Sequence, residues 1–435
     1  MIFKQINDHD VLASPAILRQ LIELPEPRAG WNSGWRRSSL GAISLYMSYH
    51  PEYTSPSAAI FENTVQWLQL TTSLPEVDIR ETVRQALYDP DAITERYKVH
   101  RIPKKDGGVR VIEAPDITLK TIQRAILHYA LDPARLRSPK AMGFVPHRSI
   151  ITNAIQHQDW SSNRETATKR YMLKMDMKDF FPSITLNQLL AQWNSRLCRT
   201  AGMLSNGALL WNADRYPGSV QEIVKRIPNG DYGFVWNISN PARYPLARDL
   251  IVAQDLITWL GLLYLCVLDD RLPQGAPTSP ALSNAVYAPV DAALANVIHN
   301  QHREDIVYTR YADDIIITAG SVMDICRLKA VVQAIIGRVP NAVINPKKTH
   351  ILRHGHPMRV TGININHVPS ISRTKRDGIR QRLFIINKEG KVTDKDKSEL
   401  IGHRAFMRKV DMLGWDARCE ILFQKMLELP VERSA

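Results

Sequence analysis

The chain has 435 residues, of which 44% are apolar, which allows two or three structural units and excludes an intrinsically disordered protein. Its 56 Lys and Arg residues exceed its 43 Asp and Glu residues, and the formal charge of +13 favours a polyanionic partner, first nucleic acid and second an anionic membrane. The longest apolar run, residues 256–268, is too short to span a bilayer, and the first ten residues contain no apolar signal core. Four scattered cysteines lack the spacing of a zinc site and are expected to be reduced thiols.

The first part of the chain predicts a helical extension and then a basic hairpin. We expect residues 1–95 to form an N-terminal helical extension, in which we find no chemical motif. Apolar and polar residues alternate over 97–115 around an Asp-Gly-Gly turn, which is typical of two antiparallel strands. Residues 117–131 place apolar side chains at helical spacing, so a helix should follow the hairpin.

Two later segments carry carboxylates among apolar neighbours. Residues 170–184 predict a strand that contains Asp176 and ends near Pro182. Residues 308–320 also have strand composition, but Asp313 and Asp314 lie in their middle, where acidic residues are unfavourable and repel each other. We therefore predict a hairpin whose turn falls on the two aspartates, which lets both lean toward the neighbouring strand.

The remaining segments predict mostly helices. We expect an irregular, elaborated segment at 195–248, a buried helix at 256–268 and a loop at 272–285 that opens another helix. A helix at 321–339, a loop and strand at 344–352 and a single strand at 359–366 should follow. The C-terminal part, 371–435, is expected to be helical, with a basic face near its start.

Three carboxylates on neighbouring strands would repel one another unless cations lay between them. Hard oxygen ligands select Mg²⁺, which keeps water ligands and takes substrate phosphates as further ligands. Two such ions activate an attacking hydroxyl group and stabilise a leaving pyrophosphate, so this pattern indicates phosphoryl transfer.

The ordered motifs resemble those of reverse transcriptases. "YADD" (311–314) is similar to the metal-binding hairpin of that family, and "MDMKDFFPSI" (175–184) to its first aspartate motif. Four other blocks occur in the family's order, and these are "IPKKDGGVRVIEAP" (102–115), "LPQGAPTSPALSNA" (272–285), "INPKKT" (344–349) and "VTGININ" (360–366). "NAIQH" (153–157) and "VTG" (360–362) further resemble two hallmarks of retron-type bacterial reverse transcriptases, which are related to group II intron and defence-associated enzymes.

This resemblance implies an α+β right-hand polymerase fold, with fingers, a palm built on an antiparallel sheet that bears the YADD hairpin, and a helical thumb. Fingers and palm would occupy residues 96–370, after the extension at 1–95, and the basic helical thumb would occupy 371–435. We expect the extension and the segment 195–248 to select the RNA or a protein partner, because both lie outside the motifs and the segment is rich in Trp, Tyr and Arg. A packed surface elaboration without a partner is an equally open interpretation of the segment.

The resemblance also implies roles for individual residues. The catalytic group would be Asp176, Asp313, Asp314 and Lys348, the last of which would protonate the leaving pyrophosphate. Two Mg²⁺ ions, for which Mn²⁺ could substitute, would bind Asp176, Asp313, Asp314 and the backbone carbonyl of Met177. The nucleotide would contact Lys104, Arg110, Phe181, Gln274 and Gly275, and the ring of Phe181 would exclude a 2′-hydroxyl group.

RNA contacts are expected from the two retron hallmarks and from the thumb. The residues concerned are Asn153, His157, Thr361, Gly362, Arg373, Lys375, Arg376 and Arg380. For Asn153 and His157, which lie four positions apart, local scaffolding is an equally open interpretation.

The function implied is RNA-directed DNA synthesis on a cognate structured non-coding RNA, primed from an RNA 2′-hydroxyl group, in the cytoplasm of a prokaryote and in a retron anti-phage defence system. Deoxynucleoside triphosphates, the RNA, its DNA product and an effector protein encoded nearby would be the partners, and no membrane is expected. One alternative is another defence-associated reverse transcriptase with different priming. A second alternative is a non-catalytic RNA-binding scaffold, against which the intact set of three aspartates argues.

Overall fold

The computed structural model describes residues 52–53, 55–104, 107–131, 138–158, 170–190, 257–300, 305–353, 355–366, 369–410 and 417–432. Most of the predicted N-terminal extension and the whole segment 195–248 lie outside the described residues. The chain divides into two compact units, one of residues 1–137 with 179–287 and the other of residues 138–178 with 288–435. Within the described ranges, no helix is both long enough and apolar enough to cross a membrane.

The first unit contains helices, some of which begin at a residue whose side chain caps the first turn. Ser55 caps α3 and Asp89 caps α5, and in each case the side-chain oxygen accepts a hydrogen bond from a backbone N–H of the first turn. The helices are α3 (Pro56–Thr71), α4 (Glu76–Tyr88), α5 (Pro90–Glu95) and α6 (Ile117–Ala125), which continues as the π-helical turn η1 (Ile126–Ala130). Residues 257–264 are helical and buried, as their apolar run predicts.

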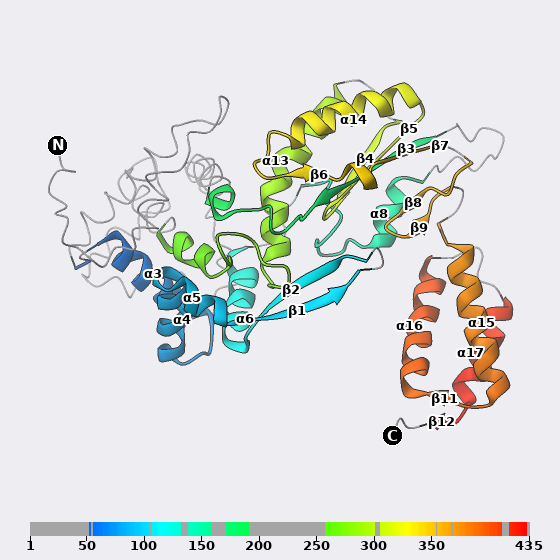
Figure 1. Ribbon diagram of the computed structural model, residues 1–435, viewed down its shortest axis with the longest axis horizontal. Helices are drawn as coiled ribbons and strands as arrows, with labels where there is room; N and C mark the ends of the chain where they lie inside the picture. The colour runs from blue at the N-terminus through cyan, green and yellow to red at the C-terminus, as the bar shows by residue number, and fades with distance from the viewer. Residues whose placement is uncertain are drawn as a thin grey trace, which may run out of the picture. The chain divides into compact units, whose positions relative to one another are not determined.

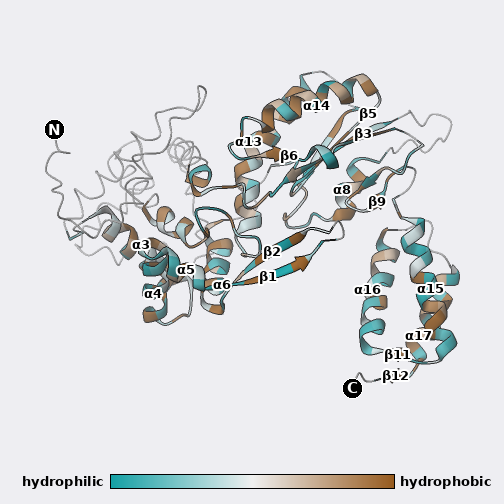
Figure 2. Cartoon of the chain, in the orientation of Figure 1, coloured by the Kyte–Doolittle hydropathy of each residue, from teal (hydrophilic) through white to brown (hydrophobic). Residues whose placement is uncertain are grey.

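The predicted basic hairpin is present as strands β1 (Tyr97–Pro103) and β2 (Val109–Pro115), which pair antiparallel from Tyr97↔Pro115 to Pro103↔Val109. Beyond Tyr97 nearly the whole of β1 is exposed, including Val99 and Ile102. Figure 2 shows brown apolar and teal polar residues alternating along the two strands. The base of the hairpin is anchored by Gln123 of α6, whose Nε2 donates to the Tyr97 hydroxyl oxygen at 2.9 Å.

The second unit is built on a five-stranded sheet of order β4-β5-β3-β6, with β7 also paired to β3. Its strands are β3 (Tyr171–Lys178), β4 (Val307–Tyr311), β5 (Asp314–Ala319), β6 (Val343–Ile344) and β7 (His350–Arg353). Helix α14 (Val322–Ile336) lies along one face, where it contacts β3, β5 and β6, and the short helix α8 (Ile150–Gln156) contacts β4 (Figure 1). Strand β3 ends at Lys178, four residues before the Pro182 at which we expected it to end.

The segment 359–366 is a tight hairpin and not the single strand that we predicted. Strands β8 (Arg359–Val360) and β9 (Ile363–Asn364) pair with each other, and β10 (Ser370–Ile371) adds to β9. The chain reverses because Thr361 and Gly362 both have positive φ, +47° and +86°. Two successive positive φ values are the geometry of a two-residue hairpin turn, which the run of apolar residues concealed.

The C-terminal part is helical, as predicted, with α15 (Arg373–Glu389), α16 (Asp394–Val410) and α17 (Ala417–Glu428). Short strands β11 (Val392–Thr393) and β12 (Val431–Glu432) pair in parallel beside them. One apolar cluster joins the helices to the sheet, since Leu383, Leu400 and Phe423 belong to the same core as Met172 of β3 and Ile316 of β5. The sheet and the three helices therefore share a single core.

A buried ion pair ties the long helix α13 (Ser279–His299) to strand β4. The guanidinium of Arg310 donates to both carboxylate oxygens of Asp291 at 2.9 and 2.8 Å, and the Tyr308 hydroxyl donates to Asp291 Oδ1 at 2.6 Å. The side chains of both partners are 0% exposed. Such a pair is costly to break because the remaining charge stays buried.

Replacing Asp291 with Asn should lower the free energy of unfolding by about 3–5 kcal/mol, because the Arg310 charge would stay buried without its counter-ion. Chemical denaturation of the full chain measures this loss. Glu432→Gln, which breaks the exposed ion pair of Lys391 and Glu432, is the matched control and should leave the unfolding midpoint nearly unchanged. A similar midpoint for Asp291→Asn and the control would contradict the importance of the buried pair.

Candidate active site

Strands β3, β4 and β5 bring the three aspartates to one end of the sheet. Asp176 of β3 lies directly opposite Asp314 of β5, and Asp314 in turn pairs with Tyr311 of β4. The turn between β4 and β5 consists of Ala312 and Asp313, so the first aspartate lies in the turn and the second opens the strand. The prediction that both aspartates form the turn was therefore wrong by one residue.

The backbone of this turn is fixed by its neighbours. Ala312 has a φ of +55°, which is uncommon for a residue with a side chain, and its carbonyl oxygen accepts a hydrogen bond from Arg310 Nη1 at 3.3 Å. The Met177 N–H donates to the Asp313 carbonyl oxygen at 3.0 Å. Gly143 also packs here, since a Cβ atom at that position would lie 2.8 Å from the Ala312 nitrogen. Residue 143 must therefore be a glycine for the preceding loop to approach the turn.

Two lysines neutralise part of the carboxylate charge. Lys174 of β3 lies 3.2 Å from Asp314 Oδ2, and Lys348 lies 3.2 Å from Asp176. Lys348 belongs to the 3-10 turn η3 (Pro346–Lys348), and the Asn345 N–H donates to the Asp176 carbonyl oxygen at 2.8 Å, which fixes this loop beside β3. The structure thus brings Lys348 to the aspartates, as the catalytic prediction requires. Its role as a proton donor stays a prediction.

Asp313 has no lysine within ion-pair distance among the described residues and is electrostatically the least favourable of the three. Burial, and then the negative charge of Asp314, raises the pKa of Asp313 to about 6. The charge of Asp176 acts in the same direction, whereas Lys348 opposes it. The group is therefore ionised at neutral pH at an energetic cost, which a bound cation would relieve.

The chemistry of these donors fits Mg²⁺, because all three side chains offer hard carboxylate oxygens, and burial followed by the charges of Asp314 and Asp176 raises the pKa of Asp313. In the part of the chain that the structure describes, however, no three acidic, His or Cys side chains converge as a ready-made metal cage. Lys174 and Lys348 instead hold the carboxylates that a cation would contact. This arrangement suits an ion that takes only some of its ligands from the protein and the rest from water and phosphates.

The predicted nucleotide residues lie in the first unit. Lys104 and Arg110 are exposed on the β1–β2 hairpin. Gln274 is held at the base of that hairpin, since its carbonyl oxygen accepts from the Glu113 N–H at 2.8 Å. Gly275 has a φ of +141°, and a Cβ atom there would lie 2.7 Å from the Glu113 carbonyl oxygen. Gly275 thus allows the loop to approach the hairpin backbone closely, and its contact with a nucleotide stays a prediction.

Phe181 and Phe180 have different environments. Phe180 is buried and stacks on Tyr287 with ring centroids 5.1 Å apart. Phe181 is only half-buried and meets Phe180 edge-on at 5.3 Å. The core aromatic of this pair is therefore Phe180, which leaves part of the Phe181 ring surface available to a nucleotide.

The first retron hallmark is internal. Asn153 and His157 are 0% and 1% exposed, so neither side chain reaches an RNA surface, and the expected RNA contact of this motif does not fit the structure. His157 instead bonds to Thr309 and Thr318 of the sheet. Both amide atoms of Asn153 are buried without a hydrogen-bond partner in the described part of the chain. Of our two interpretations of the motif, scaffolding agrees with the burial.

The second hallmark and the start of the thumb are closer to the surface. Thr361 donates its hydroxyl to the Ile150 carbonyl oxygen of α8 at 2.9 Å, whereas Gly362 faces open space. Arg373 and Arg380 both contact Asp377, and Lys375 lies over the Phe406 ring at 5.1 Å. Arg376, also predicted to contact RNA, is half-buried on the same helix. Several basic side chains of this helix therefore make contacts within the thumb, and the number of charges in the sequence does not predict these contacts.

Sequence reasoning missed several residues of the site. Lys174 precedes Asp176 by two positions, so alternation along β3 places both on one face, and this signal could have identified it. Glu113 binds Arg271 in a bidentate ion pair at 3.0 and 2.6 Å, and no short-range pattern predicts a contact over 158 residues. The sequence shows Arg310 only as a charged residue in an apolar strand and does not reveal that it pairs with Asp291.

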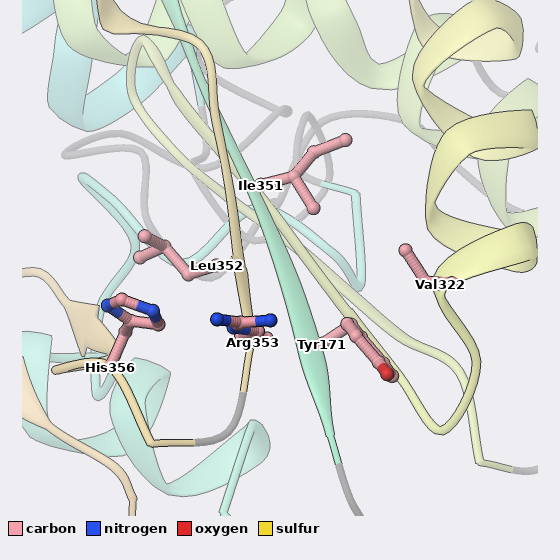
Figure 3. Close-up of a pocket in the computed structure, with 6 residues that line it drawn as sticks. All are labelled: Tyr171, Val322, Ile351, Leu352, Arg353 and His356. Carbon is pink, nitrogen blue, oxygen red and sulfur yellow. The ribbon is translucent and has the colours of Figure 1, made fainter.

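A separate hollow of about 540 Å³ lies beside the outer strand β7 and the start of α14 (Figure 3). It contains none of the predicted site residues and is lined by Tyr171, Val322, Ile351, Leu352, Arg353 and His356. Tyr171 and Arg353 are opposite each other in the β3–β7 ladder. The hollow is thus a feature of the sheet edge and not part of the aspartate site.

Asp313→Asn should stabilise the metal-free protein at pH 8 by up to about 3 kcal/mol, because it removes a carboxylate whose pKa is raised from 3.8 to about 6. A raised pKa favours the protonated folded form, so the stability from Asp313 is complete below pH 3.8 and is lost as the pH rises through 6. The advantage of the variant should therefore vanish near pH 4. Denaturation in EDTA from pH 4 to 8 measures it. Asp394→Asn, at an exposed site, is the control, and a pH-independent difference for Asp313→Asn would refute the raised pKa.

Comparison with known proteins agrees with this geometry. The family model described as reverse transcriptase (RNA-dependent DNA polymerase) matches residues 102–232 and 248–365, more than half of the chain. The retron Mx65 and Mx162 reverse transcriptases of Myxococcus xanthus are each 30% identical over 71% of this chain, which spans 63% and 57% of their lengths. The retron Ec86 reverse transcriptase of Escherichia coli is 26% identical over 70% of this chain and 74% of its own.

Among solved structures, an apo telomerase from Candida tropicalis, truncated from its C-terminal domain, is 15% identical over 72% of this chain and 59% of its own, with a TM-score of 0.39. A likeness this loose adds nothing to the assignment. The family model and the aligned retron enzymes, together with the paired Asp176 and Asp314 strands, lead to one conclusion. The chain belongs to the reverse transcriptase (RNA-dependent DNA polymerase) family.

Proposed function

We propose that this protein is an RNA-directed DNA polymerase that joins deoxynucleotides by two-metal-ion nucleotidyl transfer. The observation that carries the proposal is the β3–β5 register, which sets Asp176 opposite Asp314 with Asp313 in the adjoining turn. A protein that only bound RNA would gain nothing from three carboxylates that repel one another at the end of a sheet. For this reason we prefer an enzyme to a non-catalytic scaffold.

We assign the two Mg²⁺ ions, for which Mn²⁺ could substitute, to Asp176, Asp313, Asp314 and the backbone carbonyl of Met177. When bound, such ions lower the pKa of the attacking hydroxyl group and neutralise the leaving pyrophosphate. The primer hydroxyl group loses its proton to water as its oxygen forms a bond to the α-phosphorus, and the bond from that phosphorus to the bridging oxygen of the pyrophosphate breaks. Lys348, which lies beside Asp176, gives its proton to the departing pyrophosphate and is later reprotonated from water.

The first unit contributes residues that bind the nucleotide. Lys104 and Arg110 are exposed on their hairpin and can clamp a triphosphate, one as a point charge and the other as a planar fork. The half-buried ring of Phe181 selects a deoxyribose by steric exclusion of a 2′-hydroxyl group. We also assign Gln274 and Gly275 to the nucleotide, and their loop is bonded to the same hairpin through the Glu113 N–H.

For the template we rely on the resemblance to the retron enzymes. The aligned retron enzymes support a cognate structured non-coding RNA as template, with priming from an RNA 2′-hydroxyl group and single-stranded DNA as product. We extend this to a role in anti-phage defence in the prokaryotic cytoplasm, with an effector protein encoded nearby. A defence-associated reverse transcriptase with different priming is the alternative. Sequencing the nucleic acid that copurifies with the protein separates the two, since a branched RNA–DNA product is expected only from a retron.

Replacing Asp313 and Asp314 together with Ala should abolish DNA synthesis and leave RNA binding within about twofold of wild type. The change removes metal ligands and also relieves the repulsion that raises the pKa of Asp313, so the fold should not suffer. Incorporation of labelled deoxynucleotides and a filter-binding titration with the copurifying RNA measure the two properties. Wild-type amounts of DNA from the double variant would disprove the assigned metal site.

Phe181→Ala should admit ribonucleotides, because the extra hydroxyl group would no longer collide with a ring. We expect the ratio of kcat/KM for a deoxynucleotide to that for the matched ribonucleotide to fall by about 10- to 100-fold, the range for losing one steric contact. Phe180→Leu is the matched control, since Phe180 packs against Tyr287 in the core and should change stability more than selectivity. An active Phe181→Ala enzyme with unchanged selectivity would assign Phe181 to packing alone.

A further inference from the structure

His157 is buried beneath the strands that carry the aspartates. It follows the last residue of α8, and its side chain contacts both strands of the hairpin. The Nε2 atom lies 2.7 Å from Thr309 Oγ1 on β4, and the Nδ1 atom lies 3.1 Å from Thr318 Oγ1 on β5. Both threonines are at most 3% exposed, so water does not compete for these bonds. One imidazole therefore links the two strands through their side chains.

The chemistry of the ring matches this position. Burial, and then the positive charges of Arg170 and Lys140, lowers the pKa of His157 to about 3. The imidazole is consequently neutral at physiological pH and offers one N–H donor and one nitrogen acceptor. A threonine hydroxyl can donate or accept, so each ring nitrogen finds a complementary partner and no polar atom of the group is left unpaired.

These bonds lie on the same face of the sheet as the carboxylates. Side chains alternate along a strand, so residues 314, 316 and 318 of β5 project to one face. On β3 the residues opposite them are 176, 174 and 172. Ile316 and Met172 pack in one cluster with Ala154 of α8, which identifies this face as the one that α8 covers. Asp314 and Thr318 thus lie at opposite ends of one row of side chains on β5. His157 bonds to this row at Thr318, the end farther from the aspartates.

The opposite face of the hairpin is held by the buried pair of Asp291 and Arg310, and Arg310 also reaches the carbonyl oxygen of Ala312. Without His157, the face that α8 covers would be held by apolar packing and backbone pairing, with no imidazole bonded to both β4 and β5. Near Asp313 and Asp314 a small rotation of the hairpin matters, because displacement of a reacting group by about 1 Å can cost about 100-fold in rate.

We infer that His157 is a positioning residue for the metal-bearing hairpin, which it holds through Thr309 and Thr318. The expected effect on kcat rests on the proposed polymerase function. The expected effect on the order of the β4–β5 hairpin does not. It gives the buried histidine of the first retron hallmark a task inside the palm. The second retron hallmark, residues 360–362, is bonded to the same helix, since the Thr361 hydroxyl donates to the Ile150 carbonyl oxygen of α8.

The kinetic test uses the full-length chain on a generic primer–template. His157→Leu removes both bonds and should lower kcat by about 10- to 100-fold, with KM for the primer–template changed less than about twofold. His157→Gln can place an amide near the position of Nε2, so it should retain the shorter bond to Thr309 and lose less activity. Gln156→Ala, at the exposed neighbouring position of the same helix, is the control and should behave as wild type.

A combined variant separates positioning from stability. His157→Leu with Thr309→Val and Thr318→Val replaces the whole polar group by apolar atoms, so no buried hydroxyl is left unpaired and the melting temperature should return toward wild type. Positioning predicts that kcat stays low in this variant. Recovery of kcat together with the melting temperature would overturn the inference, as would wild-type kcat in folded His157→Leu.

Hydrogen exchange of the backbone amides of residues 307–319 completes the test without any activity measurement. Exchange should be faster in His157→Leu than in Gln156→Ala, and His157→Gln should be intermediate. Equal exchange in all three proteins would disprove the positioning role even if the wild type synthesises DNA. Conversely, faster exchange in His157→Leu with no DNA synthesis by the wild type would sustain the structural link and reject the polymerase function.

Discussion

Mutual repulsion of three carboxylates is the constraint on which the organisation of the palm depends. Asp176, Asp313 and Asp314 are brought together by a strand register and a turn that must both hold against this repulsion. Burial, and then the charge of Asp314, raises the pKa of Asp313, so the repulsion adds to a cost that burial already imposes. Lys174 and Lys348 reduce this repulsion by direct ion pairs with Asp314 and Asp176. Buried contacts on both faces of the β4–β5 hairpin hold it against the repulsion that remains.

The two faces of the hairpin are held by different chemistry. On one face a bidentate ion pair between Arg310 and Asp291 is completely buried, and such pairs favour one geometry strongly because misalignment leaves a charge unpaired. On the other face neutral hydrogen bonds from His157 join the strands at little electrostatic cost. Arg310 is already paired with Asp291, and His157 is neutral, so neither side chain competes with a cation for the three carboxylates. The turn is thus rigid, while the oxygen atoms at its tip remain available for ligands.

Much of this site could be predicted from the sequence, because its main elements depend on local patterns. The fingers hairpin follows from alternation around two glycines, and the palm hairpin from the conflict between two aspartates and a strand-forming context. Family motifs then supplied the order of the elements. The turn was misplaced by one residue because Ala312, which has no special turn propensity, adopts a positive φ that only its tertiary contacts explain.

Long-range contacts were beyond sequence reasoning. Whether His157 faces RNA or the core depends on which side of α8 meets the sheet, and a seven-residue helix gives too short a pattern to decide this. The hairpin at Thr361 was also missed because its pattern is short. Apolar residues on both sides of a two-residue turn resemble a single strand. The thumb charges show a third limit, because composition counts basic residues but does not reveal that Asp377 or Phe406 occupies them.

The lysine pairs at the aspartates have a consequence for the order in which ligands arrive. Three carboxylates with two ammonium groups leave a single net negative charge, so the cation-free palm repels an approaching polyanion far less than three bare carboxylates would. A nucleic acid can therefore dock before the divalent ions do. Each ion of the proposed pair would have to displace an ammonium group or share its carboxylate, and phosphates of the bound ligands would offset that cost. Under the proposed function, the protein would therefore bind its template first and its two metal ions last.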